Sequence, residues 1–148
     1  MARGTDLRVG RASLSTPEPL VLLNFGHPLA VSQHAQLEAL VGRSIAERRV
    51  SAHIDREVPL AQAARALTRQ VPLSSTEWQS QPLAVILPGL SVLAACLLAE
   101  IHGRSGHFPT IVNLRPAPDP ALAVTVFEVA ELVKLQAIRD DSRSIRER

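Results

Sequence analysis

Polar, small or charged residues follow four short apolar runs of this 148-residue chain. They form four groups: Asn24-Phe25-Gly26-His27, Asp55-Arg56, Pro88-Gly89-Leu90-Ser91 and Asn113-Leu114-Arg115. In open α/β sheets, ligands bind where the carboxyl ends of the strands meet. We therefore expect one site, in which Asn24 and Asn113 flank the ligand. A guanidinium group binds phosphate through two parallel hydrogen bonds, so Arg115 is the first candidate for a phosphate contact and Arg56 the second.

Pro88-Gly89 lies between two apolar runs of different periodicity. Leu83 to Leu87 is short and fully apolar, which is typical of a buried strand. Leu90 to Ile101 carries apolar residues at helical spacing. The start of such a helix offers free backbone N–H groups and the positive end of the helix dipole, and both attract anions. Gly89 would let a ligand approach the backbone closely, although an ordinary structural turn is an equally good interpretation.

Two residues near these turns are candidates for catalysis. His27 could act as an acid or base, because imidazole titrates near neutral pH, or it could merely hydrogen-bond its own turn. Ser91, near the start of the predicted helix, is the second candidate. His102 and His107 have no nearby carboxylate, so we expect neither a zinc site nor a cofactor. The chain contains no G-x-G-x-x-G, Walker or G-x-S-x-G motif, which argues against conventional NAD, ATP and serine-hydrolase functions.

Strands and helices that would position these residues alternate along the chain. We expect strands at Leu20–Phe25, Arg48–Ile54, Leu83–Leu87, Phe108–Leu114 and Ala121–Ala130. We expect helices at Val31–Val41, Leu60–Val71, Leu90–Ile101 and Glu131–Arg148, a short helical turn after Ser74, and a rigid loop over Pro116, Pro118 and Pro120. In the last helix, Leu132, Leu135 and Ile138 should face inward. This order predicts an α/β fold with a Rossmann-like, mostly parallel five-stranded sheet and helices on both faces.

Composition limits the number of domains and the kinds of partner. The length suits one domain over residues 20–148, preceded by a disordered N-terminal extension over residues 1–19. A net charge of +2 does not favour binding to duplex nucleic acid but would serve a small anionic ligand. Pro88-Gly89 splits the longest apolar stretch, which argues against a membrane span. Cys96 is the single cysteine, so no disulfide can form within the chain and a reducing cytoplasm fits.

Three blocks of the sequence carry a family resemblance: VLLNFGHPL, EWQSQPLAVILPGLSVLAACLLAEIHGRSGHFPTIVNLRP and FEVAELVKLQAIRD. They resemble a family of small CRISPR-associated proteins from type III loci, which is grouped with ring nucleases and cyclic-oligoadenylate binders. The resemblance implies a CARF-like Rossmann domain that forms a homodimer and binds cyclic tetra-adenylate, a second messenger of antiviral defence. It also implies which residues lie near the ligand: Asn24, Gly26, His27, Pro88, Gly89, Leu90, Ser91, Asn113 and Arg115.

Three functions remain open at this point. The chain could sequester cyclic tetra-adenylate and damp signalling, with slow cleavage as a side reaction. It could instead be a metal-independent ring nuclease that yields linear di-adenylate. It could also be a generic binder of an unrelated mononucleotide, in which case the resemblance misleads. For the homodimer, the small residues Ser91, Ala95 and Ala99 form a candidate seam, because a second helix could approach them closely.

Overall fold

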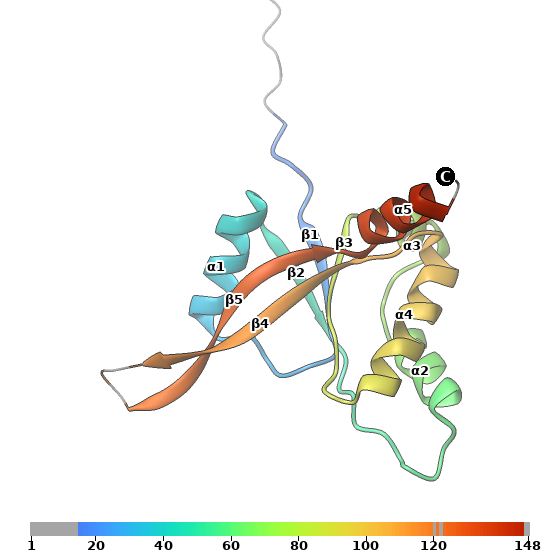
Figure 1. Ribbon diagram of the computed structural model, residues 1–148, viewed down its shortest axis with the longest axis horizontal. Coiled ribbons are helices and arrows are strands. Elements are labelled where there is room, and N and C mark those ends of the chain that lie inside the picture. Colours follow the sequence, from blue (N-terminus) through green and yellow to red (C-terminus); the bar gives the residue numbers. More distant parts are fainter. Residues whose placement is uncertain (1–14, 120, 122, 147–148) are drawn as a thin grey trace, which may run out of the picture.

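Five strands form one sheet in the order β2-β1-β3-β4-β5 (Figure 1). The computed structural model describes residues 15–119, 121 and 123–146. The strands are β1 (Leu20–Asn24), β2 (Ile45–Arg49), β3 (Leu83–Ile86), β4 (Thr110–Asp119) and β5 (Val124–Lys134). The helices are α1 (Val31–Val41), α2 (Leu60–Arg69), α3 (Ser75–Ser80), α4 (Ser91–Ser105) and α5 (Leu135–Arg146). The α/β class, the five strands and the helices on both faces of the sheet are therefore confirmed.

Each face of the sheet has its own hydrophobic core. Alternate residues of a strand point to opposite faces, so Leu23 and Phe25 join one core and Leu22 joins the other. The core with Leu23 is covered by α2, α3 and α4, and it includes the buried Trp78. The core with Leu22 is covered by α1 through Leu37, which is fully buried. Both cores consist mainly of Leu, Val, Ile and Ala, as the scarcity of aromatic residues requires.

The sheet is mixed, and the expectation of a mostly parallel sheet was wrong. β1 pairs in parallel with β2 and β3, and β3 pairs in parallel with β4. β4 and β5 instead form a long antiparallel hairpin, from Thr110↔Lys134 to Asp119↔Val124. The contact between β3 and β4 ends at Val85↔Ile111, so most of the hairpin extends past the parallel strands as an arm (Figure 1).

The rigid proline loop predicted after Arg115 is also wrong, because Pro116 and Pro118 lie within β4. Two prolines that are two residues apart lack N–H groups on the same edge of the strand. β4 keeps its pairing with β5 here, while β3 no longer pairs with it. The missing donors therefore lie on the edge without a partner strand, where proline is tolerated. Pro120 lies outside the described residues.

Further boundaries differ from the predictions, and α4 continues past Ile101 to Ser105. β2 ends at Arg49, and the alternating residues Val50, Ala52 and Ile54 form an extended segment that packs against the core without pairing as a strand. Residues 131–134 continue β5, and α5 begins only at Leu135. Pairing with β4 outweighs the helical spacing of this segment. Ile138 does not face inward, since its side chain is 54% exposed.

Other expected elements agree closely with the structure. α1 covers the predicted residues, and Gly42 ends it with a φ of 69°, a left-handed conformation that favours glycine. Ser74 and Glu77 form the predicted capping box before α3. No helix within the described ranges is both long enough and apolar enough to span a membrane. Residues 1–14 of the predicted N-terminal extension lie outside the described part of the chain.

Candidate functional site

The helices that follow β1 and β3 lie on opposite faces of the sheet. The chain leaves β1 into α1 on one face, and it leaves β3 into α4 on the opposite face. Two adjacent parallel strands whose helices go to opposite faces open a crevice at their carboxyl ends. The loop after Asn24 and the loop after Ile86 border this crevice. The structure thus brings together two of the four groups predicted from the sequence.

The two loops touch at Gly26. A Cβ atom added at Gly26 would lie 3.0 Å from Cγ2 of Ile86 and 3.3 Å from the carbonyl oxygen of Leu87. Phe25 also donates its backbone N–H to the carbonyl oxygen of Ile86, at 3.0 Å. Gly26 is therefore required for the close approach of the two loops. Gly89 differs, because a Cβ atom there would meet nothing within 4 Å.

The start of α4 is exposed. The residue before its first turn is Leu90, which has no polar side-chain atom to cap the helix and is 48% exposed. The first turn holds no acidic residue. Gly89 and Ser91 are exposed, whereas Pro88 is buried. The backbone N–H groups of this first turn can therefore donate hydrogen bonds to an anion without displacing a side-chain cap.

Asn24 has a structural position at this edge. Its side chain is fully buried, with Nδ2 donating to the carbonyl oxygen of His27 at 2.9 Å and to Oε1 of Glu47 at 2.8 Å. Its Oδ1 atom accepts the backbone N–H of Gly26 at 2.9 Å. Both ends of the amide are thus bonded within the chain. Phe25 is a core residue, 1% exposed, so neither side chain is presented to a ligand at the surface.

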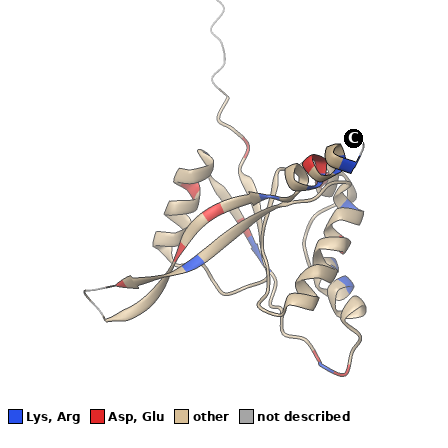
Figure 2. Cartoon of the chain, in the orientation of Figure 1, with Lys and Arg blue, Asp and Glu red and all other residues tan. Residues whose placement is uncertain are grey.

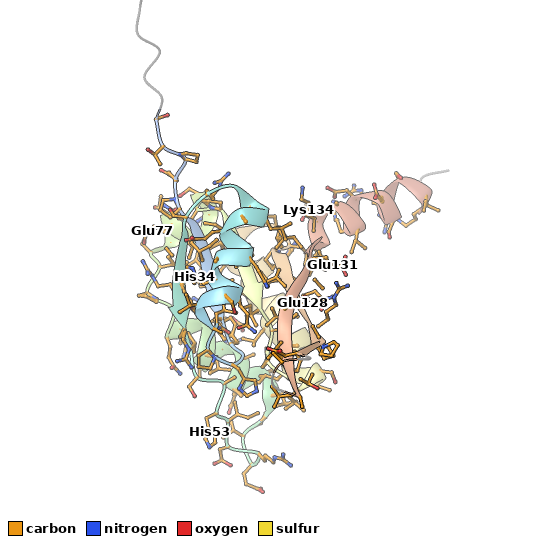
Figure 3. The ribbon with its side chains drawn as sticks, turned by 90° about the vertical axis from the view of Figure 1, so that its left-hand side faces the viewer. His34, His53, Glu77, Glu128, Glu131 and Lys134 are labelled. Carbon is orange, nitrogen blue, oxygen red and sulfur yellow. The ribbon has the colours of Figure 1, made fainter. Side chains whose placement is uncertain are left out.

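Asn113 and Arg115 lie on the arm. Alternate residues of β4 point to the same face, so both side chains lie on the face of Ile111, which is the face that α4 covers. Nδ2 of Asn113 donates to Oε1 of Glu131 at 3.2 Å, and Nε of Arg115 donates to Oε1 of Glu128 at 2.8 Å. Figure 3 shows Glu128 and Glu131 along β5. These two carboxylates carry no local signal in the sequence, because the register of the hairpin creates both pairs. Since the side chain of Arg115 is 64% exposed, its remaining N–H groups stay accessible.

The other predicted site residues lie on exposed loops. His27 is exposed in the loop between β1 and α1, and Arg56 is exposed in the turn between β2 and α2. That turn is closed by Asp55, whose Oδ1 accepts the backbone N–H of Glu57 at 2.9 Å. Both loops leave the carboxyl edge of the sheet, so His27 and Arg56 belong to the same edge as the start of α4.

Other groups considered in the sequence have structural contacts. The ring of His102 lies 4.4 Å from that of Phe108, and Nδ1 of His107 lies 3.1 Å from the carbonyl oxygen of Ser105. Among the residues that the structure describes, no three His, Cys, Asp or Glu side chains gather in a way that could hold a metal ion. Ser91, Ala95 and Ala99 are exposed on α4, and a shallow groove beside Ala99 runs toward Arg104 between α2 and α4.

Comparison with known protein families, characterised proteins and solved structures returns no match for this chain. The arrangement offers an exposed helix start, an accessible arginine on the neighbouring strand and an exposed histidine. These groups suit an anionic ligand, with the backbone amides supplying most of the directed hydrogen bonds.

Proposed function

We propose that the chain is a CARF-like Rossmann domain that binds cyclic tetra-adenylate as a homodimer. By sequestering this second messenger in the cytoplasm, it would damp the antiviral signalling of type III CRISPR systems. The observation that carries the proposal is the exposed, uncapped start of α4 beside the crevice between β1 and β3. A phosphate at this position would accept hydrogen bonds from backbone N–H groups and lie at the positive end of the helix dipole.

The symmetry of the ligand supports a homodimer. Cyclic tetra-adenylate carries four phosphates with near two-fold symmetry, and a two-fold dimer offers each binding group twice. Two starts of α4 and two copies of Arg115 would supply matching contacts to opposite phosphates. Because the guanidinium of Arg115 also bonds to Glu128, we expect Arg115 to contribute less to the binding affinity than the start of α4 does.

Sequestration is favoured over rapid cleavage. Metal-independent cleavage requires a ribose 2′-hydroxyl to attack the adjacent phosphorus in line, while the bond to the leaving 5′-oxygen breaks. The proton of the 2′-hydroxyl needs an acceptor, and the developing charge needs donors. Of the proposed site residues, only His27 carries a side chain of the type that most often serves as a general base. We therefore expect ring cleavage, if His27 and Ser91 promote it, to be slow.

The binding test uses the full chain with cyclic tri-, tetra- and hexa-adenylate and AMP. A ligand at 100 times its dissociation constant should stabilise the fold by about 2.7 kcal/mol. Cyclic tetra-adenylate alone should raise the thermal midpoint strongly. A shift with AMP but none with the cyclic tetramer would favour a mononucleotide binder instead. Product analysis of the same samples distinguishes a protein that only sequesters the ring from a ring nuclease, because a nuclease converts excess ring into linear di-adenylate.

A matched pair of variants tests the location. Gly89→Asp introduces a carboxylate at the start of α4, where the structure leaves room for a side chain. Gly103→Asp makes the same change near the other end of α4, also with open space. We expect the first variant to weaken cyclic tetra-adenylate binding by on the order of tenfold or more through charge repulsion, and the second to bind normally. Equal affinity of the two variants would place the ligand elsewhere.

A further inference from the structure

The last helix, α5, leaves its apolar side uncovered. None of its described residues is buried, and Ile138 and Ile145 are 54% and 69% exposed. With 3.6 residues per turn, Ile138, Ser142 and Ile145 form one stripe. Arg139 and Arg146 lie on one side of this stripe and Asp141 on the other. Arg139, Ser142, Arg143 and Arg146 line a shallow hollow. An amphipathic helix normally packs its apolar stripe against a core, but nothing in the described part of the chain covers Ile138 and Ile145.

The arm formed by β4 and β5 has an uncovered face of complementary character. On the face shared with Arg115, Val124 and Val126 are 50% and 41% exposed. The same face carries three carboxylates, Asp119, Glu128 and Glu131, against the single guanidinium of Arg115. It therefore combines exposed valines with an excess of negative charge. α5 combines exposed isoleucines with three arginines and two aspartates, and Arg139 is paired with Asp140. Figure 2 shows the acidic residues along β5 and the basic end of α5.

The chain cannot use its own α5 to cover this face. β5 continues into α5 without a connecting loop, at Lys134-Leu135. α5 therefore starts at the end of β5 opposite to Val124, and Figure 1 shows the helix and the tip of the arm at opposite ends of the molecule. α1 covers the opposite face of the arm, where Gln33 and Gln36 bond to β5. No described part of the chain covers the face with Val124 and Val126, which are 50% and 41% exposed.

We propose that a second copy of this chain supplies that cover, with α5 of each copy lying on the arm of the other. In a two-fold dimer the contact occurs twice, because the same two surfaces meet reciprocally. The helix is short enough to fit on the arm: the 12 residues of α5 span about 18 Å at ~1.5 Å per residue. The seven residue steps from Val124 to Glu131 span about 24 Å at ~3.4 Å each. The arginines of α5 then face the carboxylates of the partner arm.

This interface replaces the seam expected along Ser91, Ala95 and Ala99 of α4. Those residues offer close approach but no complementary charge, whereas α5 and the arm offer both apolar contact and opposite charge. The inference rests on the homodimer of the proposed function in that two copies associate, and it competes with the proposed phosphate contact of Arg115, which lies on the same face of the arm. Its test uses no ligand, so the failure of one proposal is distinguishable from the failure of the other.

The test measures the dimer dissociation constant of the full chain by sedimentation velocity. Four single aspartate substitutions at exposed positions are compared: Ile138→Asp on α5, Val126→Asp on the arm, Ala95→Asp on α4 and Leu40→Asp on α1, where Leu40 is 53% exposed. We expect the first two to raise the dissociation constant by on the order of tenfold or more and the last two to leave it unchanged. Circular dichroism checks that each variant is folded.

Two further measurements exclude other arrangements. A mixture of Ile138→Asp and Val126→Asp chains retains one intact contact, so it should form more dimer than either variant alone. Raising the salt concentration should weaken the dimer, because the contact joins opposite charges. A monomeric natural chain, a dimer broken only by Ala95→Asp, or a dimer that salt strengthens would each overturn the proposal. Binding of a monomeric chain to anionic lipid vesicles through α5 would overturn it as well.

Discussion

The side chain of Asn24 donates a hydrogen bond from Nδ2 to Oε1 of Glu47, at 2.8 Å, and so joins β1 to β2. The same amide also accepts the N–H of Gly26 and donates to the carbonyl oxygen of His27. Asn24 thereby fixes the conformation of the loop after β1, which contacts the loop between β3 and α4 at Gly26. A residue predicted to contact the ligand turns out to shape the loop that borders the crevice.

The first prediction concerns the stability contributed by Asn24. Asn24→Ala would leave half-buried groups on Gly26 and Glu47 without this partner, and we expect a loss of about 1–3 kcal/mol in the free energy of unfolding. The exposed Asn113 has one contact, with Glu131, and Asn113→Ala should cost less than about 0.5 kcal/mol. Urea denaturation of both variants measures the two losses. Equal losses would contradict the structural role of Asn24.

The second prediction separates the two glycines of the crevice. Gly26→Ala would force a Cβ atom to within 3.0 Å of Ile86, whose side chain is held in the core. We expect a loss of about 1–3 kcal/mol in the free energy of unfolding from this overpacking. Gly89→Ala meets open space and should leave the fold as stable as before or slightly more so. Thermal and urea unfolding of the pair would show the difference, and equal stability would contradict the close contact of the two loops.

The third prediction concerns the outer edge of the sheet. The N–H of Val129 donates to Oε1 of Gln36 at 3.0 Å, and Nε2 of Gln33 donates to the carbonyl oxygen of Phe127 at 2.8 Å. Two glutamines of α1 thus satisfy backbone groups of an edge strand, which would otherwise be open to pairing with another chain. Gln36→Ala should accelerate hydrogen exchange at the Val129 amide by on the order of tenfold. Gln33→Ala is the control, because its bond is to a carbonyl oxygen, and similar acceleration by both variants would argue against the assignment.

The fourth prediction concerns acid stability at the start of α3. Hydrogen bonds from the backbone and then the side chain of Ser74 hold the pKa of Glu77 below its ordinary value of 4.5. A carboxylate with a lowered pKa in the fold stabilises the protein above that ordinary value, and this stabilisation is lost as the pH falls through the lowered pKa. The advantage of the natural chain over Glu77→Gln should therefore be present at pH 7 and shrink toward pH 3.

Urea midpoints of the two chains at pH 7 and pH 3 measure this change. Ser74→Ala serves as a companion variant, since it removes the cap itself and should cost about 1 kcal/mol at neutral pH. The backbone N–H of residue 74 remains in that variant, so replacing Glu77 by glutamine there should still show the same pH dependence, reduced only by the loss of the side-chain hydrogen bond. A difference between the natural chain and Glu77→Gln that stays constant from pH 7 to pH 3 would show that the charge of Glu77 contributes nothing to the cap.

Local chemistry in the sequence determined those elements whose signals lie within a few neighbouring residues. The apolar run at Leu83 predicts a buried strand, the spacing after Leu90 predicts a helix, and Ser74 with Glu77 predicts a cap. All three occur in the structure. Gly42 likewise ends α1 because its left-handed conformation depends only on the local backbone.

Only the tertiary structure decided the pairing of β4 with β5 and its consequences. Residues 131–134 have helical spacing, yet they pair as a strand because β4 offers them partners and the core gains Leu132. The same register joins Arg115 to Glu128, and the packing of β1 against β2 joins Asn24 to Glu47. These contacts connect residues far apart in the chain, and their energies depend on burial and register, which no local pattern of residues encodes.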